Sequence, residues 1–117
     1  MITIPPNTDI YVAVENVDFR NGINGLGRIC REKIRKDPMN KALYVFRNKK
    51  KTTLKILYYD GSAFWLFMRR LSTGKIKWWP SSNQFACSLE SKKLQILIMN
   101  GNPEGAEFGD DWKKVLS

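Results

Sequence analysis

The sequence has no histidine and two cysteines, Cys30 and Cys87. Without histidine, neither a Ser-His nor a Cys-His pair can form, so these routes to nucleophilic catalysis are excluded. The two cysteines lie far apart and match no zinc-binding spacing. We interpret them as buried thiols of a reducing compartment. The sequence therefore predicts no metal site and no cofactor.

Long hydrophobic runs are also absent. The most apolar segments have the length of a strand, well short of the roughly 18 residues that suggest a membrane span. Residues 1–17, MITIPPNTDIYVAVENV, lack the cationic start and apolar run of a secretory signal. We therefore expect a cytoplasmic, bacterial-type protein with no membrane partner.

The composition is that of a globular protein. The chain has 117 residues, of which 43% are hydrophobic and 12% aromatic, which predicts one domain with a modest core. We assign residues 1–100 to this domain. Residues 101–117 are predicted to be an acidic tail, which either folds back over a basic face or docks loosely through Phe108 and Trp112.

Positive charge exceeds negative charge by a wide margin. Lysine and arginine total 20 against 11 aspartate and glutamate, a formal net charge of +9. This balance favours polyanionic partners, with nucleic acid ahead of an anionic membrane surface. The alternative is a protein whose cations simply face water.

Hydrophobic periodicity predicts an α+β fold. Alternation indicates a first strand at Ile10–Val14, and helical spacing indicates a helix from Gly22 to Lys36. Further strands are predicted at Ala42–Arg47, at Thr53–Tyr59, after the Asp60-Gly61 turn, and at Lys75–Trp79. A short C-terminal helix, Leu89–Met99, would be capped by Ser88. The predicted order is strand, helix, antiparallel four-stranded meander, short helix.

The Asp60-Gly61 dipeptide is typical of a two-residue hairpin turn. Such a turn would pair Tyr59 with Ser62 and bring Ile56 opposite Trp65. We expect the helix face made of Ile23, Leu26, Cys30 and Ile34 to pack on the sheet face that carries Ile56 and Trp65. That sheet face would hold Leu54, Ile56, Tyr58, Ala63, Trp65 and Phe67.

Cationic side chains fall in two separate stretches that the predicted meander brings together. Adjacent hairpins turn at opposite ends of a sheet, so the loop after Leu71 should return to the end that holds Lys49–Lys51. One basic patch would result. Such a patch suits contacts with DNA phosphates, which position a protein on the duplex without recognising the base sequence. The alternative is an ordinary soluble turn. The candidate nucleic-acid-binding residues are Arg47, Lys49, Lys50, Lys51, Arg69, Arg70, Lys75 and Lys77.

No catalytic residue is predicted. Metal-dependent strand transfer needs clustered carboxylates, and Asp18, Asp60 and Glu90 are the trio to consider. Asp60 is explained by its turn and Glu90 by a helix start, while Asp18 either pairs with Arg20 or caps the helix. We therefore do not expect an enzyme.

Two stretches resemble a known family. VDFRNGINGL is similar to the helix-entry motif, and LYVFRNKKKTTLKILYYDGSAFWLFMRRLSTGKIKWWP to the hairpin core, of the TnpB accessory proteins of the insertion sequence 66 family. The likeness covers Ile10 to Pro80 and, more weakly, the helix after Ser88. Phe19, Ala63 and the acidic tail depart from the family pattern. The family has no established catalytic residues, so none carry over.

The resemblance implies a transposon-encoded accessory protein that acts beside a separate transposase. Combined with the basic patch, it predicts a non-enzymatic factor that touches DNA directly. The alternative is a protein–protein adaptor for the transposase complex whose charge serves solubility. Aromatic side chains such as Trp78 and Trp79 are either buried or available to the transposase or a second copy of the chain.

Overall fold

The computed structural model describes residues 7–103. Its elements are, in chain order, β1 (Ile10–Ala13), α1 (Ile23–Ile29), the π-helical segment η1 (Cys30–Ile34), β2 (Leu43–Arg47), β3 (Thr53–Tyr59), β4 (Phe64–Arg70), β5 (Ala86–Ser88) and α2 (Ser91–Ile98). The strands form one sheet in the order β4-β3-β2-β1-β5. The predicted α+β class is confirmed, and β2, β3 and β4 are the antiparallel meander. The sheet is nevertheless mixed, because β1 runs parallel to β2.

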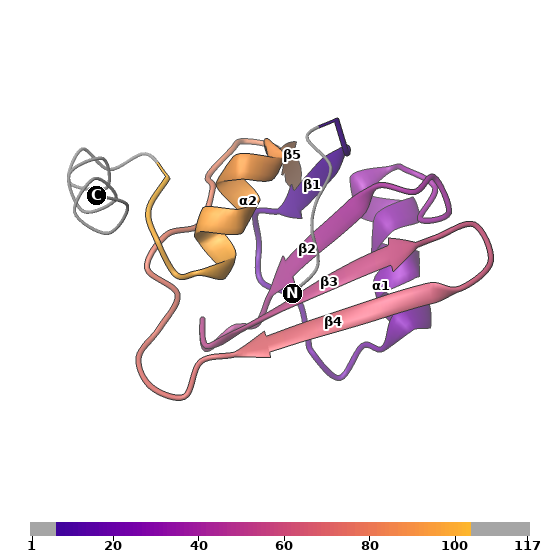
Figure 1. Cartoon of the computed structure of the whole chain (residues 1–117). Helices are drawn as coiled ribbons and strands as arrows, with labels where there is room; N and C mark the ends of the chain where they lie inside the picture. The colour runs from indigo at the N-terminus through magenta and orange to yellow at the C-terminus, as the bar shows by residue number, and fades with distance from the viewer. Residues whose placement is uncertain (1–6, 104–117) are drawn as a thin grey trace.

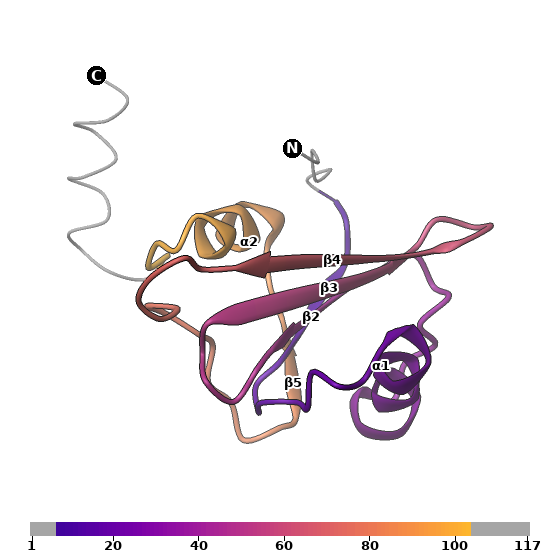
Figure 2. The same cartoon turned by 90° about the horizontal axis from the view of Figure 1, so that it is seen from below.

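Helices cover both faces of the sheet. Figures 1 and 2 show α1 on one side and α2 on the other, with the strands between them. Each face carries its own apolar cluster. One gathers Leu26, Cys30, Tyr44, Phe46 and Leu57 beneath α1 and η1, and the other gathers Val45, Leu54, Ile56, Leu94 and Leu97 beneath α2.

The predicted pairing of helix and sheet face is wrong. The first helix packs on the face that carries Leu57, whereas Ile56 lies on the opposite face with α2. Alternation along a strand separates two faces but does not say which helix covers each one. Both faces are apolar here because both are covered.

The register at the Asp60-Gly61 turn also differs from the prediction. Tyr59 pairs with Phe64 and Ile56 with Phe67, so four residues rather than two connect the strands. Trp65 is 51% exposed and is not a core residue. It lies on β4, which forms one edge of the sheet, and its ring stacks against that of Phe67 with the centroids 6.0 Å apart.

The predicted strand Lys75–Trp79 does not form. This stretch is a loop whose apolar side chains, Ile76, Trp78 and Trp79, pack against the cluster beneath α2. The last strand is instead Ala86–Ser88, which adds to the far edge of the sheet beside β1. The alternation of polar and apolar residues in Lys75–Trp79 therefore belongs to a loop whose apolar side chains pack on the core, and not to a strand.

The helices begin and end close to the predicted positions. The first one continues through η1 and ends at Arg35, whose φ of 64° is left-handed. The C-terminal helix begins at Ser91 after Glu90, with no side-chain cap, so the predicted Ser88 cap is wrong. Of the predicted acidic tail, residues 104–117 lie outside the described residues.

Candidate nucleic-acid interface

Two loops far apart in the sequence meet at one end of the sheet. The backbone N–H of Leu71 donates to the carbonyl oxygen of Thr52 at 2.9 Å, and that of Ile76 donates to Lys51 at 2.7 Å. The loop after β4 therefore lies directly against the β2–β3 turn, as the meander geometry predicted. We call the eight cations predicted from the sequence the basic end: Arg47, Lys49, Lys50, Lys51, Arg69, Arg70, Lys75 and Lys77.

An uncharged side chain fixes the lysine-rich turn. The Asn48 amide oxygen accepts from the backbone N–H groups of Thr52 and Thr53, at 3.0 and 3.1 Å. The Lys51 N–H donates to the Asn48 carbonyl oxygen at 3.1 Å. Lys49, Lys50 and Lys51 are exposed. Because Asn48 holds the turn, their ammonium groups are not needed to form it.

Arg47 has a different environment from the turn lysines. Its guanidinium carbon lies 4.9 Å from the centroid of the Trp79 ring, and its Nε donates to the Asn16 amide oxygen at 3.1 Å. The side chain is half-buried, and this burial lowers the pKa of the guanidinium below its usual value. Arg47 thus ties three segments together, and less of it is available to a ligand.

Arg69 and Arg70 point to opposite faces because they are adjacent on β4. Arg69 shares a face with Leu54, its cross-strand partner, and its Nε donates to the Ile98 carbonyl oxygen at the end of α2. Arg70 pairs with Thr53 and is exposed on the face beneath α1. The two arginines therefore widen the basic end across both faces instead of reinforcing a single spot.

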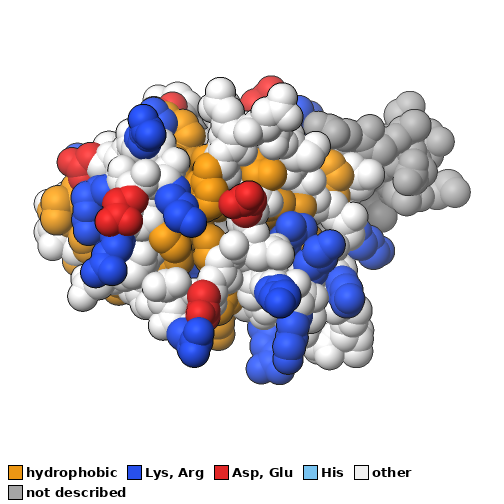
Figure 3. Space-filling view, turned by 180° about the vertical axis from the view of Figure 1, so that it is seen from behind, with side chains coloured by type: hydrophobic (Ala, Val, Ile, Leu, Met, Phe, Trp, Pro, Cys, Tyr) orange, Lys and Arg blue, Asp and Glu red, His pale blue; other side chains and the backbone are white. Residues whose placement is uncertain are grey.

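Lys75 and Lys77 are exposed in the loop after β4. This loop is held by Asn100, whose Oδ1 accepts from the Lys77 N–H at 2.9 Å and whose Nδ2 donates to the Lys75 carbonyl oxygen at 3.4 Å. Backbone atoms make both contacts, so the two ammonium groups remain free to turn outward. Figure 3 shows Lys and Arg side chains gathered over the loop end of the sheet.

The loop after β1 also lies at the basic end, which the sequence did not predict. The Val17 N–H donates to the Arg47 carbonyl oxygen at 3.0 Å, which brings the loop after β1 beside the lysine turn. A shallow hollow of about 580 Å³ lies between them, lined by residues 16–19 and by Asn48, Lys49 and Lys50. No local signal could have revealed this contact, because it joins residues about thirty positions apart.

The carboxylates considered for catalysis have structural contacts. Asp18 pairs with Arg20 at 2.6 Å, as predicted, and the hydrogen bonds from Arg20 lower the pKa of Asp18 to about 2. Asp60 accepts from its own turn and from Trp65, and Glu90 precedes α2. Within residues 7–103, no three histidine, cysteine or acidic side chains come together as metal ligands. In the same range, no helix is long and apolar enough to cross a membrane.

The chain is similar to a known protein family and to known proteins. The family model described as IS66 Orf2 like protein matches residues 8–106. Two uncharacterized proteins of Sinorhizobium fredii (strain NBRC 101917 / NGR234) are similar to it. y4jC is 31% identical over 91% of this chain and 82% of its own length, and y4hO is 27% identical over 97% and 90%. No solved structure matches.

The fold and the site define a small α+β protein with a basic end. The family match extends over most of this chain, so the protein belongs to the IS66 Orf2-like family. Membership gives it a transposition-associated accessory role in the context of an insertion sequence.

Proposed function

We propose that this protein is a non-enzymatic accessory factor for transposition of an insertion sequence. It binds DNA through the basic end and acts in the bacterial cytoplasm with the separate transposase of the same element. The proposal rests on family membership for the process and on the basic end for the contact with DNA.

The observation that carries DNA binding is the convergence of two cationic loops. Hydrogen bonds from Leu71 and Ile76 hold the loop after β4 against the β2–β3 turn. Exposed lysines of both loops, Lys49–Lys51 on one side and Lys75 and Lys77 on the other, therefore lie at the same end of the sheet. Such a surface neutralises backbone phosphates and releases counterions, which supplies affinity without sequence preference.

Binding to element-end DNA at several salt concentrations tests the proposal. The full chain is titrated into a duplex carrying the element end and into an unrelated duplex of equal length, with and without transposase. We expect log affinity to fall steeply with log salt, and by similar amounts for both duplexes when the transposase is absent. Absence of binding at low salt would refute direct contact with DNA.

A second candidate function, an adaptor for the transposase complex, is favoured by apolar exposure on β4. Trp65 is 51% exposed and Met68 64% exposed on this edge strand. Exposed aromatic and methionine side chains are enriched at protein interfaces. Co-purification with transposase in nuclease-treated, high-salt buffer would support the adaptor, and its loss in Trp65→Ser or in Met68→Ser would show which face of β4 makes the contact.

The non-enzymatic part of the proposal has its own test. Purified protein is incubated with element-end DNA and Mg²⁺ or Mn²⁺, and the products are resolved on a denaturing gel. We expect no cleavage or joining. Activity that follows this protein through purification and disappears in Asp18→Asn or Asp60→Asn would show that it is an enzyme.

A further inference from the structure

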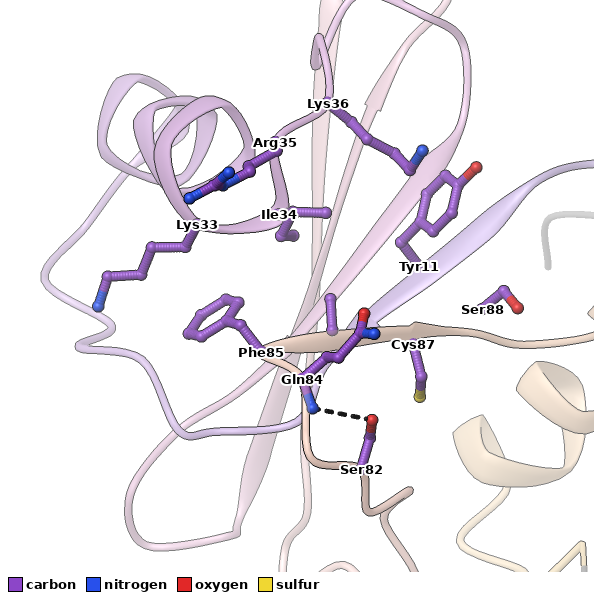
Figure 4. A pocket seen from close by; sticks show the side chains of 11 residues that line it. Tyr11, Lys33, Ile34, Arg35, Lys36, Ser82, Gln84, Phe85, Cys87 and Ser88 are labelled. Atoms are coloured by element: carbon purple, nitrogen blue, oxygen red, sulfur yellow. Dashed lines mark hydrogen bonds between the residues drawn. The ribbon is translucent and has the colours of Figure 1, made fainter.

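A second cationic site lies away from the basic end, between η1 and the β5 edge of the sheet. The groove has a volume of about 620 Å³. Three cations line it, Lys33, Arg35 and Lys36, and its lining contains no carboxylate. Figure 4 shows these side chains on the helix side and the β5 residues on the other. The charge of the groove therefore favours an anionic ligand.

Small side chains form the floor of the groove, so they leave space above the strand. Ala86 and Ser88 pair with Ala13 and Tyr11 of β1, so they lie on the sheet face that carries Tyr11. Between the larger rings of Phe85 and Tyr11, these two residues leave room above the strand. Cys87 alternates to the opposite face, and Figure 4 shows its sulfur directed away from the groove.

β5 offers hydrogen-bonding groups along the edge of the sheet that borders this groove. Phe85 accepts from the Val14 N–H at 2.7 Å, and the Leu89 N–H donates to Ile10 at 2.9 Å. Bonding alternates along an antiparallel pair, so Ala86 and Ser88 direct their N–H and C=O groups away from β1. β5 is the last strand of the sheet. No described residue hydrogen-bonds to these outward groups.

Lysines already cover the aromatic rings of the groove. Lys36 Nζ lies 4.7 Å from the centroid of the Tyr11 ring, and Tyr11 also stacks with Tyr44 at 5.6 Å. Lys33 Nζ lies 5.3 Å from the centroid of Phe85. Nucleic-acid strands are held by bases stacked on free ring faces. The rings here have less free surface to offer, whereas the strand edge is open.

We propose that this groove binds an extended acidic segment of a partner protein, which adds as a strand beside β5. Main-chain hydrogen bonds to Ala86 and Ser88 supply the pairing, as in other cases of strand addition. Lys33, Arg35 and Lys36 receive carboxylates on alternate positions of that segment. The same cations discourage pairing with basic strands, so charge selects the partner.

Two variants separate pairing from charge. Ser88→Pro removes the outward N–H of Ser88, and proline is tolerated on an edge strand where this group faces solvent. Ser88→Ala is its matched control, because it keeps the N–H. Lys33→Gln with Lys36→Gln removes two cations and leaves the strand unchanged. Circular dichroism and the unfolding midpoint check that each variant is folded.

The probe is a capped, fluorescent peptide of alternating glutamate and valine, compared with its glutamine–valine counterpart and with a short oligothymidylate. We expect the acidic peptide alone to bind, with about tenfold weaker binding in Ser88→Pro and in the lysine variant, and unchanged binding in Ser88→Ala. No binding of the acidic peptide, or equal binding to Ser88→Pro, would overturn the proposal. Preferred binding of oligothymidylate would assign the groove to nucleic acid instead. Neither result depends on whether the basic end binds duplex DNA.

Discussion

The two ends of β3 carry turns that use charge in opposite ways. At one end, the Asp60 carboxylate accepts from the N–H groups of Ser62 and Ala63 and from the Trp65 indole, each at 2.8 Å. These bonds, with that from Trp65 first, hold the pKa of Asp60 well below its usual range. At the other end, the neutral Asn48 holds the turn. Within residues 7–103, no hydrogen bond or ion pair engages the ammonium groups of residues 49–51.

The difference shows when a charged turn residue is available to a partner. A charged side chain that hydrogen-bonds within its own turn cannot bind a partner without destabilising that turn. A charged side chain is free to bind when a neutral neighbour makes the hydrogen bonds that hold the turn. The Asp60 turn is therefore a structural device, whereas the exposed ammonium groups of Lys49–Lys51 are free for the contact with DNA that we propose. Three predictions separate the two ends of β3 or set a reference between them, and a fourth compares the two thiols.

The largest effect is expected on DNA binding from neutralising the lysine turn. Replacing Lys49, Lys50 and Lys51 by glutamine should lower the salt dependence of log affinity by roughly 2–3 units, at about 0.9 per lost phosphate contact. Stability should hardly change, since exposed lysines contribute little to folding. Salt titrations of the wild type and the triple variant measure this. Equal slopes would show that these lysines make no phosphate contact.

Truncating the middle of β3 sets the scale for damage to the fold. Leu57 is fully buried between the sheet and the first helix. Leu57→Ala should lower the free energy of unfolding by about 2–5 kcal/mol, as measured by urea denaturation. Trp65→Ala, at a half-exposed position, should cost clearly less. A Trp65 variant as unstable as the Leu57 variant would contradict the placement of Trp65 on an open edge.

Loss of the Asp60 charge should affect stability and leave DNA binding unchanged. The folded-state pKa of Asp60 lies below the unfolded value of about 3.9, so its contribution is complete above that pH and is lost as the pH falls towards the lowered pKa. Asp60→Asn should therefore be less stable than the wild type at neutral pH, with the difference shrinking below about pH 4. Urea midpoints measured across this range test it. A difference that persists unchanged in acid would exclude the carboxylate as its source.

The smallest contrast concerns the two thiols. Cys30 is fully buried, which raises its pKa to about 12, and Cys87 is half-buried with its pKa raised by the same cause. Since the thiolate is the reactive form, a disulfide reagent at mildly alkaline pH should label Cys87 slowly and Cys30 only after unfolding. Cys87→Ser should then show no labelling in the native state. Rapid labelling of that variant would show that the first helix opens.

Local patterns predicted the central strands and the first helix. β1, β2 and β3 are rich in β-forming apolar residues, and their observed bounds agree with the prediction to within one residue. Convergence of the two basic loops also followed from the antiparallel order alone. These features depend on neighbours in the sequence, which is why periodicity and turn signals were sufficient.

The features that the sequence did not predict depend on distant contacts. β5 has three residues and forms because β1 offers an open edge, more than seventy positions earlier. Polar and apolar residues alternate in the Lys75–Trp79 stretch, but this stretch does not pair with β4, which remains an edge strand of the sheet. Arg47 was grouped with the free cations, and its contact with Trp79 depends on how that loop crosses the core. None of these contacts produces a recognisable pattern in a short segment of the sequence.

The parallel pairing of β1 with β2 has a consequence for the order of folding. The hairpins β2–β3 and β3–β4 form by closing short loops. Pairing of β1 with β2 closes a longer loop that contains the first helix, and pairing of β5 with β1 closes a loop of most of the chain. Loop closure over longer distances is slower. We expect the lysine turn to form early and the groove beside β5 to form last. Pulsed hydrogen exchange would then protect β3 before β1, so the surface proposed for DNA would form before the surface proposed for a protein partner.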